Sequence, residues 1–96
     1  MALIEIMSTA FNQYRSGIVY AIQYGDYDAA VVFLRGMTAM LPIGSRPHLP
    51  DIPQPSNLAQ DLQDKAVKWQ WVVEANFLVE EAISKWIHTN LARMNM

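Results

Sequence analysis

The chain has 96 residues, a net charge of −2 and no cysteine, and 52% of its residues are hydrophobic whereas only 17% are charged. This length predicts a single domain, residues 1–96, and the missing cysteines exclude disulfides and thiol chemistry. The seven basic residues are spread along the chain and form no basic patch for a nucleic acid, so no nucleic-acid partner is expected. Because typical domains carry about 25% charged residues, the shortage of charge favours a homo-oligomer or a protein partner.

The amino-terminal segment MALIEIM lacks the basic region of a secretory signal, and Glu5 interrupts its apolar run. No window approaches the roughly 20 uncharged apolar residues of a membrane-spanning helix. We therefore expect no membrane segment and a cytoplasmic location.

Two helices joined by a short turn are predicted in the first half of the chain. Residues 2–24 place apolar side chains at spacings of three and four, which is typical of a helix that buries one face. Gly25 suits the position after a helix C-terminus, and Asp26 suits the N-cap of the next helix, which is expected over residues 27–41. So short a connection makes the two helices antiparallel neighbours.

Residues 25–42 resemble the inner turn and second helix of a tetratricopeptide repeat. The resemblance rests on Gly25-Asp26-Tyr27-Asp28-Ala29-Ala30, followed by Leu34, Met37 and Pro42. A similar G-D-Y-x-x-A turn occurs in microtubule-interacting and transport domains, which are three-helix hairpins. The Trp-Leu-Gly motif of the repeat's first helix has no counterpart here, and no second copy follows. The resemblance therefore implies a helical hairpin and not a repeat array, which needs about three repeats.

All five prolines lie between residues 42 and 56, and neither a helix nor a central strand tolerates that density, so an extended crossover is predicted there. A third helix is predicted over residues 57–94, opened by a capping box of Asn57 and Gln60, with a break near Asp64 as the alternative. Its apolar residues cover most of its circumference. It must therefore be covered from several sides, by the remaining chain or by another subunit.

The predicted fold is all-α: an antiparallel helical hairpin plus a long third helix after the proline-rich crossover, in an oligomeric bundle. Glu80 projects onto the apolar side of the third helix, with Asn76 one turn earlier. A buried carboxylate must be paired or neutralised, and Arg15 and Arg35 are plausible partners, as is Lys65 at the far end of the helix. We interpret Glu80, Asn76 and the two arginines as buried polar groups that set helix register. The expected contacts with a partner subunit are Trp69, Trp71, Val72, Val79, Ile83 and Trp86.

The predicted function is non-catalytic, as an assembly or adaptor protein that contacts copies of itself or another helical protein. His48 and Asp51 are too few ligands for a metal site, and no catalytic or cofactor-binding motif is present, so no catalytic residue, metal or cofactor is assigned. Two alternatives stay open. One is a small helical enzyme with a composite pocket around Glu80, and the other is a nucleic-acid-binding regulator that uses Lys65, Lys68, Trp69 and Trp71.

Overall fold

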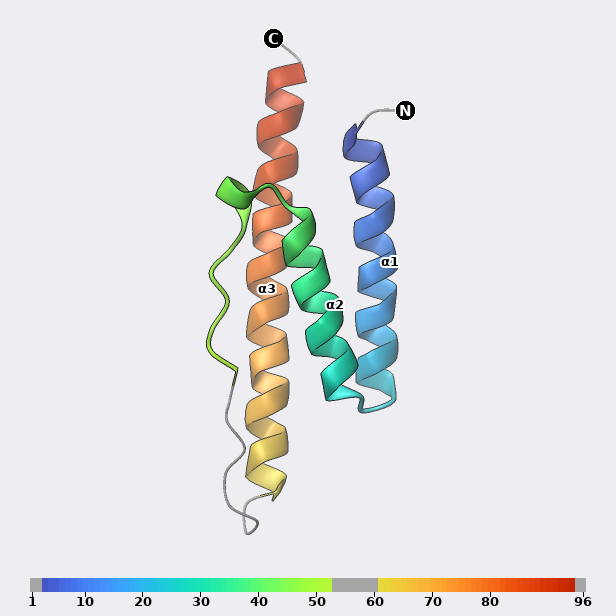
Figure 1. Ribbon diagram of the computed structural model, residues 1–96, viewed down its shortest axis with the longest axis vertical. Helices are drawn as coiled ribbons and strands as arrows, with labels where there is room; N and C mark the ends of the chain where they lie inside the picture. The colour runs from blue at the N-terminus through green and yellow to red at the C-terminus, as the bar shows by residue number, and fades with distance from the viewer. Residues whose placement is uncertain (1–2, 53–60, 95–96) are drawn as a thin grey trace.

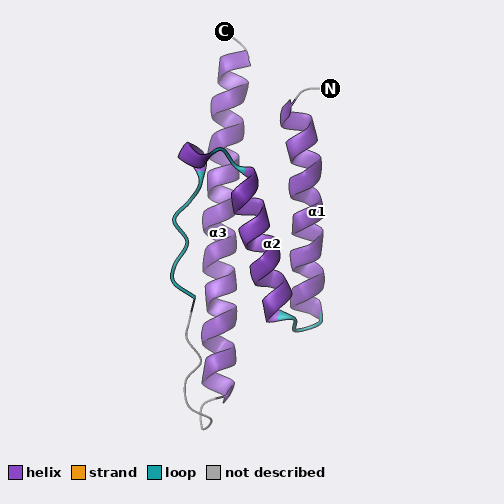
Figure 2. Cartoon of the chain, viewed as in Figure 1, coloured by secondary structure: helices purple, strands orange, loops and turns teal. Residues whose placement is uncertain are grey.

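The computed structural model describes residues 3–52 and 61–94, which form three α-helices and one short 3-10 turn (Figures 1 and 2). The helices are α1 (Leu3–Gln23), α2 (Tyr27–Met40) and α3 (Asp61–Met94), and the turn is η1 (Ile43–Ser45). No strand occurs among these residues, so the predicted all-α class is confirmed. The expected start of the third helix, with its capping box of Asn57 and Gln60, lies outside the described residues.

A capped turn joins α1 to α2 and makes the two helices antiparallel (Figure 1). Gly25 has a φ of 67°, in the left-handed region that favours glycine. The side chain of Asp26 accepts a hydrogen bond from the backbone N–H of Ala29 at 3.1 Å, so it satisfies one of the amides left unpaired at a helix N-terminus. Farther along the hairpin the ring of Phe33 lies over Gly17, where a Cβ would come within 3.0 Å of the ring. The two helices therefore pack closely.

The proline-rich segment carries the chain back along α3, so that α3 runs parallel to α2 (Figure 1). We call residues 46–52 the strap. The side chains of Leu49 and Ile52 pack against the core, and the indole Nε1 of Trp71 donates a hydrogen bond to the backbone oxygen of Pro50 at 2.8 Å. These contacts hold the strap on α3. The helix itself is continuous from residue 61 to residue 94, without a break near Asp64.

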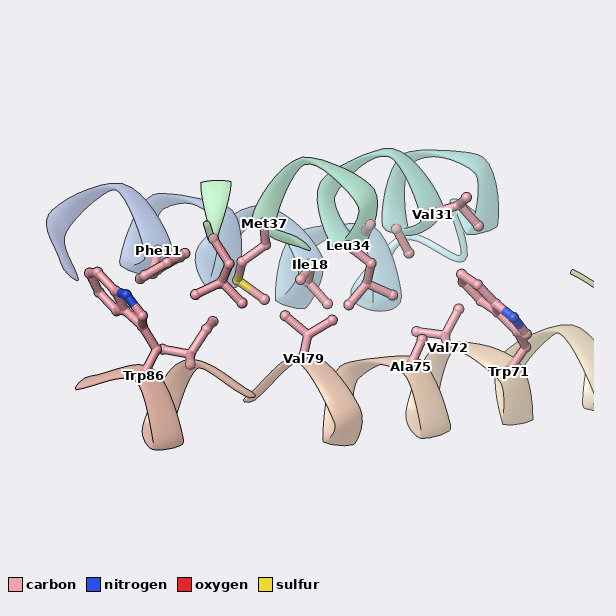
Figure 3. Close-up of a cluster of buried hydrophobic side chains, with 14 of the residues drawn as sticks. Phe11, Ile18, Val31, Leu34, Met37, Trp71, Val72, Ala75, Val79 and Trp86 are labelled. Carbon is pink, nitrogen blue, oxygen red and sulfur yellow. The ribbon is translucent and has the colours of Figure 1, made fainter. Parts of the chain in front are cut away.

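The core forms where one face of α3 meets the hairpin (Figure 3). Phe11 and Trp86 lie at one end of this cluster and Val31 and Trp71 at the other. The rings of Phe11 and Trp86 meet edge to face, with centroids 6.4 Å apart. Each large apolar side chain buried in this way stabilises the fold by roughly 1.5–3 kcal/mol. The largest fully buried side chains are Phe11, Leu34, Met37, Leu41, Val72, Val79 and Ile83.

The molecule is elongated, with extents of 58 × 23 × 15 Å. Its radius of gyration is 15.5 Å, whereas a compact chain of this length would have about 12.5 Å. Helix α1 packs mainly on α2, and α2 packs on α3, so α2 lies between the other two helices (Figure 2). The opposite face of the bundle, formed by α1 and α3, is not covered by any other described element.

Candidate functional site

Most of the side chains predicted to contact a partner subunit are buried inside this chain. Trp69 is the exception: it is half-buried, and its ring packs edge to face on Tyr27 with centroids 6.1 Å apart. The hairpin and the strap therefore supply much of the cover that α3 requires, and a contact with another molecule must use other side chains. The buried members of the set are Trp71, Val72, Val79, Ile83 and Trp86.

Arg15 of α1 and Glu80 of α3 form the one salt bridge found among the side chains of residues 3–52 and 65–93. The Arg15 Nε donates to both carboxylate oxygens, at 2.9 and 3.0 Å, and Nη1 donates to Asn12 Oδ1 at 2.8 Å. The two side chains are 35% and 37% exposed, so water screens the pair. Because the two residues are distant in sequence, the pair shows which parts of the antiparallel helices α1 and α3 lie level with each other.

The prediction that four polar side chains are buried is corrected by the structure, since no polar or charged residue is fully buried in the described part of the chain. Arg35 is exposed on α2 and forms no salt bridge with Glu80. Asn76, Arg15 and Glu80 are half-buried. The physical reason is that α2 covers only one side of α1 and α3, so polar side chains on their other side reach water.

From the position of the Arg15–Glu80 contact we infer an apolar patch on the face of the bundle that α2 leaves open. Ile22 follows Arg15 by seven residues, and Val73 precedes Glu80 by seven. Because α1 and α3 are antiparallel, seven residues forward on α1 and seven residues back on α3 lead toward the same end of the bundle. A step of seven also returns to nearly the same face of a helix, within about 20°. Ile22 and Val73 therefore lie at the same height along the bundle axis. With one neighbour on each helix they form the patch: Val19 (64% exposed), Ile22 (49%), Val73 (66%) and Phe77 (65%).

A groove of about 640 Å³ separates the start of the crossover from the C-terminal half of α3. Residues 42–48, which include η1, form one wall, and α3 forms the other between Leu78 and Arg93. The lining contains three of the chain's seven basic residues but one of its nine acidic residues, so the groove is positive although the chain is negative. We call it the basic groove. Its charged residues are Arg46, Lys85, Arg93 and Glu81.

No pattern in the sequence pointed to the basic groove, because its two walls are thirty or more residues apart in the chain. The apolar patch had a partial signal. Val73 belongs to the wide apolar surface recognised on the third helix. That it lies at the same height as Ile22 depends on how α1 and α3 align. Glu80 does not line the basic groove. The groove therefore differs from the composite pocket expected around that carboxylate.

Tyr27, at the start of α2, has a buried hydroxyl without a hydrogen-bond partner in the described structure. Burial, assisted by the negative charge of Asp28 and opposed by the positive charge of Arg35, raises the pKa of this hydroxyl above its usual 10.0. The Nζ of Lys68 lies over the Tyr27 ring, 5.2 Å from its centroid. Lys68 and Trp69, which a nucleic-acid-binding regulator would use, both contact Tyr27.

In the parts of the chain that the structure describes, no three histidine, aspartate or glutamate side chains cluster closely enough to hold a metal ion. None of the described helices combines the length and the hydropathy needed to cross a membrane. Comparison of the chain with known protein families, with curated proteins and with solved structures found no match.

Proposed function

We propose that this chain is a non-catalytic helical assembly protein that associates with copies of itself through the apolar patch. The observation that supports the proposal is the exposure of four large apolar side chains from two helices, each about half to two thirds exposed, which the helix steps from Arg15 and Glu80 place on one face. Contiguous exposed apolar surface of this kind marks contact sites more often than scattered single residues do.

The amount of exposed surface is consistent with this proposal. The chain has an accessible surface of 6838 Å². A compact monomer of 10.9 kDa would expose roughly 5,600 Å², so this chain exposes about 1,200 Å² more. A standard interface covers roughly 800 Å² on each partner. The excess belongs to the elongated chain as a whole, and its size is comparable to the area that one standard contact covers.

A second copy is the partner that the patch fits most simply. A twofold interface uses the same surface on both subunits, and an apolar patch is complementary to itself. If two such faces packed together, a helix of one subunit would lie against α1 and α3 of the other, as in a four-helix arrangement. Asn76 and the Arg15–Glu80 pair border the patch and would supply the polar contacts that fix its alignment.

The test is the absolute mass by light scattering after size exclusion, at low micromolar and at high concentration. Val19 and Val32 are a matched pair of variants, because both are valines on a helix and both are 64% exposed, but Val32 lies on α2 outside the patch. We expect a dimer or larger species that Val19→Glu dissociates and Val32→Glu leaves intact. An unpaired carboxylate buried at the contact costs several kcal/mol, which weakens association by about a hundredfold or more.

Two outcomes would contradict the proposal. One is a monomeric mass for the wild-type chain at every concentration. The other is an equal effect of the two glutamate substitutions, because the patch would then have no special role. Circular dichroism of each variant shows whether the helices are intact, so a loss of mass caused by unfolding is recognised.

A further inference from the structure

We propose that the basic groove binds an acidic, extended peptide segment of another protein. In this arrangement the carboxylates of the peptide meet the three basic side chains of the groove, and an apolar side chain of the peptide lies against the apolar residues of the groove lining. The site is separate from the apolar patch, so it adds a partner to the chain beyond its association with itself.

The charge of the groove supports an anionic ligand. Outside the groove the chain has four basic and eight acidic residues, whereas the groove has three basic residues and one acidic residue. Neither Lys85 nor Arg93 lies within salt-bridge distance of a carboxylate in the described part of the chain. Positive charge concentrated in this way on a negative protein attracts a negative partner to one place on the surface.

Arg46 gives the groove a positioned donor. Its Nε donates to the backbone oxygen of Leu41 and its Nη2 donates to the backbone oxygen of Ala39, both at 2.8 Å. These carbonyls lie at the C-terminal end of α2, where a positive charge is favoured. The Nη1 group takes part in neither bond. Because the guanidinium is already ordered, Arg46 loses less conformational entropy when a carboxylate binds it.

The shape of the groove favours an extended peptide over a compact small molecule. Leu78 and Arg93 bracket about four turns of α3, so the groove follows the helix for roughly 22 Å, the length of about six extended residues. It is open along one side, whereas pockets for small molecules bury roughly 70–90% of the ligand surface. The lining also includes the apolar residues Leu78, Ala82 and Trp86, which offer an apolar contact beside the charged side chains.

A nucleic acid fits the groove less well than an acidic peptide does. Its phosphates carry closely spaced negative charges, and binding requires a long basic surface. Here Glu81 interrupts the basic residues, and the rest of the chain is acidic. A peptide with spaced carboxylates meets the three basic side chains without placing further charge against the acidic surface.

The test uses a fluorescein-labelled hexapeptide of four glutamates and two leucines, measured by fluorescence anisotropy against the full chain. The control peptide has glutamine in place of glutamate. We expect Lys85→Gln and Arg93→Gln each to weaken binding by about three- to tenfold. Glu81→Gln should strengthen binding, because it removes the one carboxylate in the groove. Lys65→Gln is the matched control, since Lys65 is an exposed basic residue of α3 outside the groove.

The location is checked by amide chemical shifts of the isotopically labelled chain, which should change at residues 42–48 and 78–93 when the acidic hexapeptide is added. Equal binding of the glutamate and glutamine peptides would overturn the proposal, as would an equal effect of the Lys65 and Lys85 substitutions. Tighter binding of a single-stranded oligonucleotide or of inorganic phosphate would also overturn it. The groove variants should leave the mass of the assembly unchanged, so this test is independent of self-association.

Discussion

The salt bridge between Arg15 and Glu80 joins the first and third helices, and its contribution to stability can be worked out from its geometry. One nitrogen of Arg15 donates to both carboxylate oxygens, so the contact lacks the two parallel bonds of the strongest arginine–carboxylate pairs. The side chains are also 35% and 37% exposed, which allows water and salt to screen them. We therefore expect a coupling energy of about 0.5–1 kcal/mol, or roughly a two- to fivefold change in the folding equilibrium constant.

The measurement is a double-mutant cycle of Arg15→Gln, Glu80→Gln and the double variant, by urea unfolding at one fixed protein concentration. The cycle removes the effect of the bond from Arg15 to Asn12, because that bond is lost in both variants that carry the arginine change. Glu81→Gln in place of Glu80→Gln is the control, since Glu81 is exposed and forms no salt bridge in the described structure, and its coupling to Arg15 should be near zero. A coupling above about 2 kcal/mol would refute the screening argument. A coupling equal to that of the control would show that the pair contributes nothing.

Three further predictions concern polar groups of aromatic residues. Tyr27→Phe removes a buried hydroxyl that has no hydrogen-bond partner in the described structure. We expect thermal unfolding to show a variant as stable as the wild type, or more stable by about 1 kcal/mol. A loss of about 1 kcal/mol would contradict the conclusion that this hydroxyl is unpaired. The raised pKa of Tyr27 contributes stability that is fully present below the unfolded pKa of about 10 and is lost as the pH rises through the folded value. Stability above pH 10 should therefore fall more steeply in the wild type than in Tyr27→Phe. Trp71→Phe removes the hydrogen bond to Pro50 and replaces the indole with a smaller ring. Urea unfolding should show that the free energy of unfolding falls by about 1–2 kcal/mol. An unchanged midpoint would mean that this contact with the strap adds no stability.

The hairpin turn was predictable because its determinants are local. Gly25 and Asp26 act through their own backbone conformation and through the first amides of the next helix, so adjacent residues contain the whole signal. The long third helix was predictable for a similar reason, since the spacing of its apolar residues extends without glycine or proline from residue 61 to residue 94.

The candidate sites could be predicted only in part. Glu80 and Arg15 were expected as partners and do form an ion pair, whereas Arg35 was an equally reasonable partner from the sequence and is exposed on α2. Charge alone does not distinguish two arginines, because the choice depends on which helix lies beside Glu80. Trp71 and Trp86 were expected to contact another subunit, and they are buried within this chain.

The sequence by itself determined the three helices, the antiparallel turn and the need for α3 to be covered on several sides. Those properties follow from helix periodicity, capping and proline chemistry, which act over a few residues. Only the tertiary structure decided what covers α3 and what stays exposed. Two features depend on the alignment of segments far apart in the chain: Ile22 and Val73 lie at the same height along the bundle, and Arg46 and Lys85 line one groove. No local pattern encodes that alignment.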